Sequence, residues 1–127
     1  MGYEKIVDYE QVIGRKLTCN GPIEIGATCV TQIDGRFFLL VEIEIGVVDN
    51  EREEVIIFEI TAAEAAALIA AGVMRCQIVT TIPTPGSGEE VNLICVFVVG
   101  QNAFLVFNVE NATDRLVLVR VPLCTIA

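Results

Sequence analysis

The chain has 127 residues, which suits one domain of ordinary size, and 54% of them are hydrophobic. Seventeen acidic residues against eight basic ones give a net charge of −9. This charge repels phosphate backbones and anionic lipid headgroups, which argues against nucleic-acid and membrane partners. Histidine is absent, so catalysis by an imidazole base is excluded.

The apolar residues favour sheets over helices. Valine and isoleucine together supply 33 residues and leucine only 9, and β-branched side chains pack well on a pleated surface but lose freedom in a helix. Residues 1–20 are predicted to form an N-terminal arm or edge strand, and residues 21–127 a single β domain. Because the charged N-terminus contains no apolar run of signal-peptide length, we expect a cytoplasmic protein.

Residues 23–33 and 36–45 predict a first hairpin, because both segments alternate apolar and polar side chains around Asp34-Gly35. With a two-residue loop, the apolar side chains of one strand would lie beside the glutamates of the other, so the two apolar faces would point to opposite sides of the hairpin. We therefore expect a three-residue connection with a bulge at Gly35, which places the glutamates of both strands on the solvent side. The expected apolar pairs are Cys29 with Leu39, Ala27 with Val41, and Ile25 with Ile43.

The expected solvent face of this hairpin carries three carboxylates, those of Glu24, Glu42 and Glu44. Such a cluster could supply an acid-base pair or bind a divalent cation through its oxygens. The simpler interpretation, which we prefer, is a solvated sheet face without a bound metal.

One short helix is predicted at residues 61–72, directly after a strand at residues 53–60. Thr61 and Glu64 have the spacing of a capping box. The alanines in residues 62–71 supply helix propensity, and Gly72 suits the position after the last turn.

The C-terminal half predicts further strands at residues 73–82 and 115–121, with a loop rich in proline and glycine at residues 83–90. Residues 91–109 contain no charge, which fits either a membrane-spanning helix or a buried hairpin. Gly100-Gln101-Asn102 stands in the middle and segments rich in valine and phenylalanine flank it, so we predict a hairpin. About eight strands and one helix indicate an all-β fold, an antiparallel β-sandwich or a small barrel.

Five cysteines occur at wide spacing with no Cys-x-x-Cys pair. Without histidine, this pattern argues against a zinc site, and no segment suggests another cofactor. We expect Cys29, Cys76 and Cys95 to be buried thiols, because each falls in a strand-like segment.

The favoured function is a non-enzymatic structural or assembly protein that forms a homo-oligomer through apolar β surfaces. Strands such as residues 91–99 are apolar on both faces, whereas a sheet packed on one side shows one polar face, so something must cover the second face. The residues expected to form this core or interface are Phe97, Val99, Phe104 and Val106.

Two alternatives remain open at the level of sequence. The apolar surplus could instead line a cavity that binds a small ligand. The third hypothesis is a carboxylate-based or metal-dependent enzyme that uses the Glu24, Glu42 and Glu44 surface.

Overall fold

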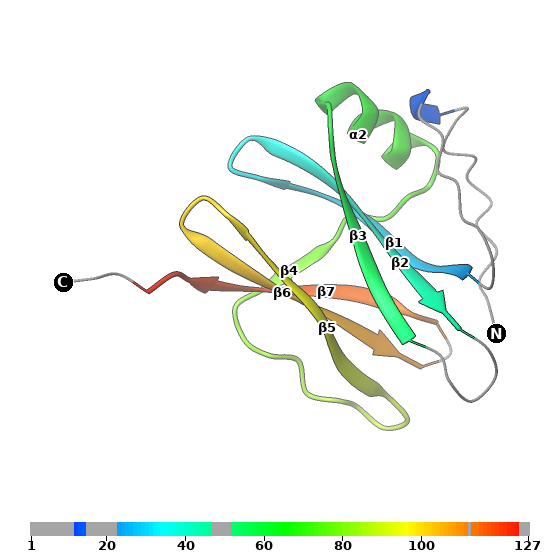
Figure 1. Ribbon diagram of the computed structural model, residues 1–127, viewed down its shortest axis with the longest axis vertical. Helices are drawn as coiled ribbons and strands as arrows, with labels where there is room; N and C mark the ends of the chain where they lie inside the picture. Colours follow the sequence, from blue (N-terminus) through cyan, green and yellow to red (C-terminus); the bar gives the residue numbers. More distant parts are fainter. Residues whose placement is uncertain (1–11, 15–22, 47–51, 112, 125–127) are drawn as a thin grey trace. The chain divides into compact units, whose positions relative to one another are not determined.

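A computed structural model describes residues 12–14, 23–46, 52–111 and 113–124 (Figure 1). Contacts within the chain divide it into two compact units, Met1–Arg75 and Cys76–Ala127. The predicted N-terminal arm, residues 1–20, lies outside the described residues except for residues 12–14. The single β domain over residues 21–127 stays a prediction.

The first unit contains a three-stranded antiparallel sheet and a short helix. The strands β1 (Ile23–Ile33), β2 (Arg36–Ile45) and β3 (Arg52–Ile60) follow one another in the order β1-β2-β3, as a meander. The helix α2 (Ala62–Ala70) begins immediately after β3, which allows it to fold back onto the sheet.

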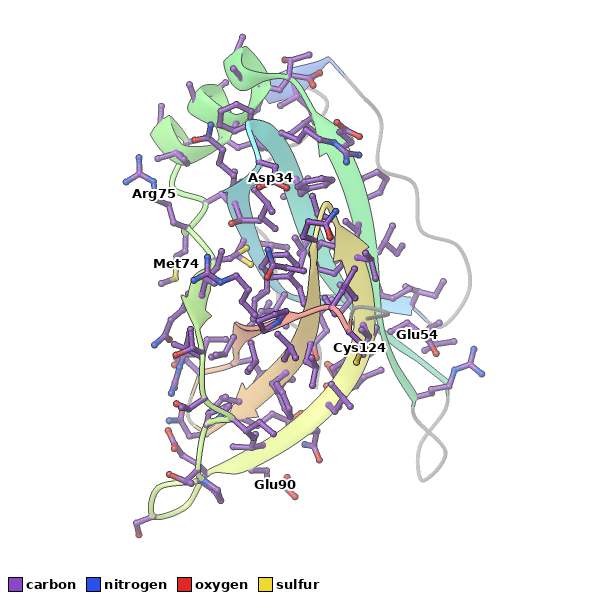
Figure 2. All side chains as sticks on the ribbon, turned by 90° about the vertical axis from the view of Figure 1, so that its left-hand side faces the viewer. Asp34, Glu54, Met74, Arg75, Glu90 and Cys124 are labelled. Carbon is purple, nitrogen blue, oxygen red and sulfur yellow. The ribbon has the colours of Figure 1, made fainter. Side chains whose placement is uncertain are left out.

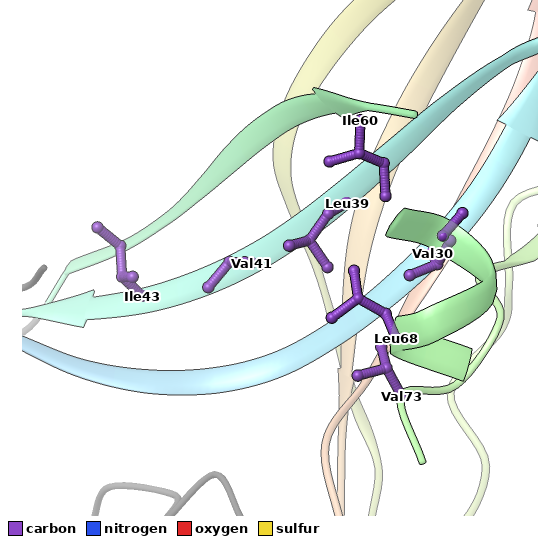
Figure 3. Packing of buried hydrophobic residues seen from close by; sticks show 8 residues of the cluster. Val30, Leu39, Val41, Ile43, Ile60, Leu68 and Val73 are labelled. Atoms are coloured by element: carbon purple, nitrogen blue, oxygen red, sulfur yellow. The ribbon is translucent and has the colours of Figure 1, made fainter. Parts of the chain in front are cut away.

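The core of this unit lies between α2 and one face of the sheet (Figure 3). Ala65 and Leu68, three residues apart on one side of the helix, are its buried positions, and Leu68 is completely inaccessible to solvent. The alanine-rich helix therefore contributes Leu68, the half-buried Ile69 and the small side chain of Ala65 to the packing. The buried members of the cluster are Val30, Leu39, Val41, Ile43, Ile60, Ala65, Leu68 and Val73.

The helix termini confirm the predicted capping signals. The Glu64 N–H donates to Thr61 Oγ1 at 3.1 Å, and the Thr61 N–H donates to Glu64 Oε1 at 2.9 Å, which together form the capping box. Ala71 is the C-cap, and Gly72 follows with a φ of +105°, a conformation that glycine adopts without steric cost.

The turn between β1 and β2 differs from the predicted one. Asp34 and Gly35 form a two-residue loop, with Ile33 paired to Arg36. Both loop residues have positive φ, +53° and +74°, as a type I′ turn requires. The predicted three-residue connection, with a bulge at the turn, is therefore wrong.

The bulge lies inside β1 instead. The pairing with β2 shifts between Ile25 and Thr28, so that Ile25 still faces Ile43 as predicted, while Thr28 rather than Ala27 faces Val41. On the turn side of this bulge most residues on both faces of the hairpin are buried, which removes the conflict between apolar faces that the sequence had suggested. The residue opposite Leu39 is consequently Val30, and Cys29 faces Leu40.

The second unit contains a four-stranded sheet. Its strands are β4 (Gln77–Val79), β5 (Glu90–Val99), β6 (Asn102–Glu110) and β7 (Arg115–Pro122), in the order β4-β7-β6-β5. The pairs β5-β6 and β6-β7 are antiparallel, whereas β4 runs parallel to β7.

The charge-free segment at residues 91–109 forms the predicted hairpin, made of most of β5 and β6. Within the described ranges no helix combines the length and the apolar character needed to cross a membrane. The described residues form seven strands in two sheets, together with the short helix α2, and this confirms the predicted all-β class. The strand expected at residues 73–82 is reduced to the three residues of β4, and Met74 and Ile82 are exposed.

Candidate functional site: an apolar sheet face

The three predicted glutamates lie on the same side of the β1-β2 hairpin but in different surroundings. Glu24 faces Glu44 across the two strands, and Glu24 is exposed while Glu44 is half-buried. Glu42 is completely buried, so the expectation of a solvated position is wrong for this residue.

Glu42 belongs to the β-bulge. The Ala27 N–H donates to Glu42 Oε1 at 3.2 Å, so the carboxylate accepts a hydrogen bond from a backbone group of the bulged segment. A Cβ atom at Gly26 would stand 2.6 Å from the same oxygen, which explains why the neighbouring residue has no side chain. This arrangement gives Glu42 a structural role in shaping β1.

The described residues contain no group of three or more His, Cys, Asp or Glu side chains positioned to hold a metal ion. The prediction of buried thiols at Cys29 and Cys76 is wrong, because both are disulfide-bonded. Cys95, which is half-buried, and Cys124, which is exposed, are thiols. The cysteines are widely spaced and form no Cys-x-x-Cys motif, so the sequence did not indicate which of them form disulfides and which remain thiols.

The four residues predicted as core or interface share one face of the second sheet. Val99, Phe104 and Val106 are buried, with exposures of 3% or less, and Phe97 is half-buried. Phe97 pairs with Phe104 across β5 and β6, and their rings stack with centroids 5.5 Å apart. The structure therefore brings these four side chains together, and their role in an interface stays a prediction.

The opposite face of the same sheet carries a group of exposed apolar side chains that the sequence analysis did not select. On β5 the exposed fractions are 52% for Leu93, 54% for Val96 and 58% for Val98. Val121 on β7 adds a fourth, at 39%. On β6, the half-buried Leu105 lies opposite Val96 and the half-buried Ala103 lies opposite Val98 and Val121, whereas Phe107 opposite Leu93 is buried. We define the exposed apolar face as Leu93, Val96, Val98, Ala103, Leu105 and Val121.

The cross-strand register makes this face continuous. Val96 lies opposite Leu105, and the row of Val98, Ala103 and Val121 crosses three strands without a polar side chain. Soluble monomers rarely leave such contiguous apolar surface in water, so the face is a candidate for a contact with another molecule.

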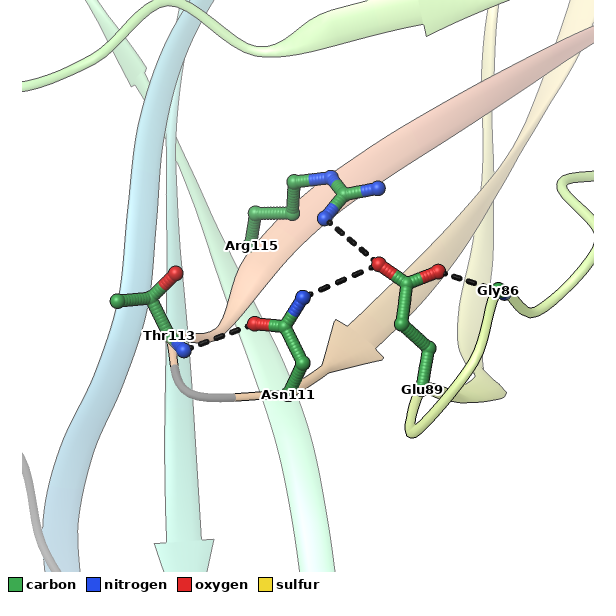
Figure 4. Close-up of polar contacts among 5 residues, drawn as sticks. All are labelled: Gly86, Glu89, Asn111, Thr113 and Arg115. Atoms are coloured by element: carbon green, nitrogen blue, oxygen red, sulfur yellow. Dashed lines mark hydrogen bonds and ion pairs between the residues drawn. The ribbon is translucent and has the colours of Figure 1, made fainter.

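A polar network closes the other end of this sheet (Figure 4). Glu89, just before β5, accepts hydrogen bonds from the Gly86 N–H at 2.8 Å and from Asn111 Nδ2 at 3.1 Å, and its carboxylate lies 3.5 Å from Arg115 Nη1. Chiefly the hydrogen bond from Gly86, together with the charge of Arg115, lowers the pKa of Glu89 below its ordinary value.

The network ties the proline- and glycine-rich loop to the β6-β7 turn. Asn111 also accepts a hydrogen bond from the Thr113 N–H at 2.9 Å, which fixes the turn itself. Glu89 and Arg115 thus place opposite charges at this end of the sheet, while residues 91–99 contain no charge.

Comparisons with protein-family models, with curated proteins and with solved structures gave no match.

Proposed function

We propose that the protein is a non-enzymatic assembly protein that forms a homo-oligomer through the exposed apolar face. The observation that carries the proposal is the exposure of Leu93, Val96 and Val98, each more than half accessible, within the uncharged residues 91–99. A surface of this kind is stabilised when a second apolar surface covers it.

The expected energetic contribution is substantial for each side chain. Burying the exposed half of a valine or leucine contributes about 1 kcal/mol, since full burial contributes about 1.5–3 kcal/mol. In a symmetric dimer each such residue is buried twice, once in each copy. The side chains of this face therefore offer enough apolar surface to offset part of the entropy lost on association.

The test compares the oligomeric state of three full-length proteins by gel filtration with light scattering. Val98→Asp places a charge in the exposed apolar face, and Ile82→Asp places the same charge at a similarly exposed isoleucine outside the strands. We expect the unmodified chain and Ile82→Asp to form the same multimer, and Val98→Asp to shift toward the monomer. A multimer that resists Val98→Asp would show that another surface mediates assembly.

The cytoplasmic location inferred from the sequence remains a proposal. The disulfide-bonded state of Cys29 and Cys76 weighs against it, because most cytosols keep thiols reduced.

A further inference from the structure

β5 lies at the edge of its sheet, next to the exposed apolar face. In the order β4-β7-β6-β5 it pairs with β6 on one side, and no other strand of the described residues pairs with its second side. An edge strand presents backbone N–H and C=O groups that another strand can satisfy. The chemistry of this edge therefore selects an extended peptide segment as its partner.

The other sheet edges of the described residues carry features that discourage such pairing. β3 contains Arg52, Glu53, Glu54 and Glu59, and charged residues are a common protection of edge strands (Figure 2 labels Glu54). β1 is partly covered, because the Val30 N–H donates to the Met74 carbonyl at 2.9 Å. β4 has only three residues.

β5 lacks this protection along most of its length. Its one charged residue is Glu90, which lies at its first position (Figure 2). The pairing with β6 shifts between Leu93 and Cys95, and from Cys95 onward it is regular. Residues 95–99 are thus an uncharged and regularly paired segment, and β6 is the one described strand that pairs with it.

The uncharged segment is the edge at which two copies of this acidic chain meet with the least repulsion. Each copy carries a net charge of −9, so two copies repel one another wherever acidic surfaces meet. Residues 95–99 contain no charge, and pairing the segment with itself places no like charges opposite each other. The contact is self-complementary, as a two-fold interface requires.

We propose that residues 95–99 of two copies pair antiparallel, edge to edge, around a two-fold axis near Phe97. This geometry joins the two four-stranded sheets into one and sets Val96 of each copy opposite Val98 of the other, on the exposed apolar face. The inference rests on the proposed assembly function and specifies the partner, and its contact covers the edge side of Val96 and Val98 rather than the whole exposed apolar face.

The test is a charge exchange at Val98 in the full chain, with the mass in solution measured by light scattering. Val98→Lys and Val98→Asp each place like charges near one another across the two-fold axis, so each variant alone should lose the dimer. An equimolar mixture of the two variants should recover it, because the charges then have opposite signs. Circular dichroism spectra matching the unmodified chain establish that both variants fold.

A second measurement keeps the proposal falsifiable if a variant fails to fold. Hydrogen exchange of the unmodified chain should show the β5 amides slowed by about tenfold or more at high concentration relative to high dilution, while the β3 amides stay unchanged. A multimer whose β5 exchange does not depend on concentration would overturn the edge pairing and leave the proposed function standing.

Two other outcomes separate the remaining possibilities. If the variants fold and lose the dimer but their mixture does not recover it, the partner of residues 95–99 is not the same segment of a second copy, and the inference is wrong. If the unmodified chain is monomeric at every concentration, the proposed function fails as well. Protection of β5 only on adding a different peptide would likewise overturn the inference.

Discussion

Replacing Gly26 by alanine tests whether Glu42 shapes the bulge in β1. The added Cβ atom would lie 2.6 Å from Glu42 Oε1. The oxygen would have to retreat by about 0.8 Å to reach ordinary van der Waals contact. Glu42 is completely buried, and its hydrogen bond from the Ala27 N–H is already 3.2 Å long. A retreat of the oxygen away from Gly26 and Ala27 would therefore break this bond.

The expected loss of stability follows from these two effects. Crowding in a packed interior costs about 1–3 kcal/mol, and a lost hydrogen bond adds about 1 kcal/mol, so we expect Gly26→Ala to lower the free energy of unfolding by about 1–4 kcal/mol. The φ of Gly26 is not positive, so backbone strain contributes nothing to this figure. Urea unfolding followed by circular dichroism measures it.

A double-mutant cycle with Glu42→Ala separates the crowding from other causes. Removing the carboxylate leaves space for the new Cβ, so Gly26→Ala should cost clearly less in the Glu42→Ala background than in the unmodified chain. Equal costs in the two backgrounds would refute the account of the bulge, because the clash with Glu42 would then not be the reason for glycine at this position.

Three further predictions concern the turn, a carboxylate and the cysteines. Gly35→Ala should cost about 1 kcal/mol through its φ of +74°, and Gly35→Asn less; equal melting midpoints for both variants would contradict the type I′ turn. The pKa of Glu89 is lower in the folded chain than its ordinary value of 4.5, so its stabilising effect is present above that pH and is lost as the pH falls through the lowered value. The difference in unfolding midpoint between the unmodified chain and Glu89→Gln should therefore shrink from neutral pH to about pH 3, and a constant difference would count against the network. Alkylation of the denatured, unreduced chain should leave Cys29 and Cys76 unmodified by mass spectrometry, and reaction of either before reduction would contradict the disulfide-bonded state.

Local signals in the sequence were sufficient for several elements. The capping box of Thr61 and Glu64 and the glycine at position 72 located the helix, because these interactions act within a few residues. The glycine and polar residues in the middle of residues 91–109 likewise indicated a turn between two strands.

The register of the first hairpin required information that alternation alone does not contain. The alternation of apolar and polar residues predicted the extra residue at the turn, whereas it lies beside Gly26, where Glu42 occupies the space of a side chain. A bulge in the strand and a bulge in the turn both bring Ile25 opposite Ile43, so the pattern could not distinguish them.

The candidate site was predictable only in part for a similar reason. The uncharged residues 91–109 indicated that both faces of the sheet are apolar, but the sequence does not show which face a single chain buries. Phe97 and Val99 were selected on β5, while the more exposed residues are Val96 and Val98 on its other side.

The central claim, assembly through the exposed apolar face, is tested most directly by the mass of the unmodified chain in solution. Light scattering during gel filtration over about a hundredfold range of concentration gives that mass, and a non-reducing gel of the same samples identifies any disulfide between chains. We expect a stable whole-number multiple of 13.8 kDa without such a disulfide. A mass of 13.8 kDa at every concentration would contradict the account.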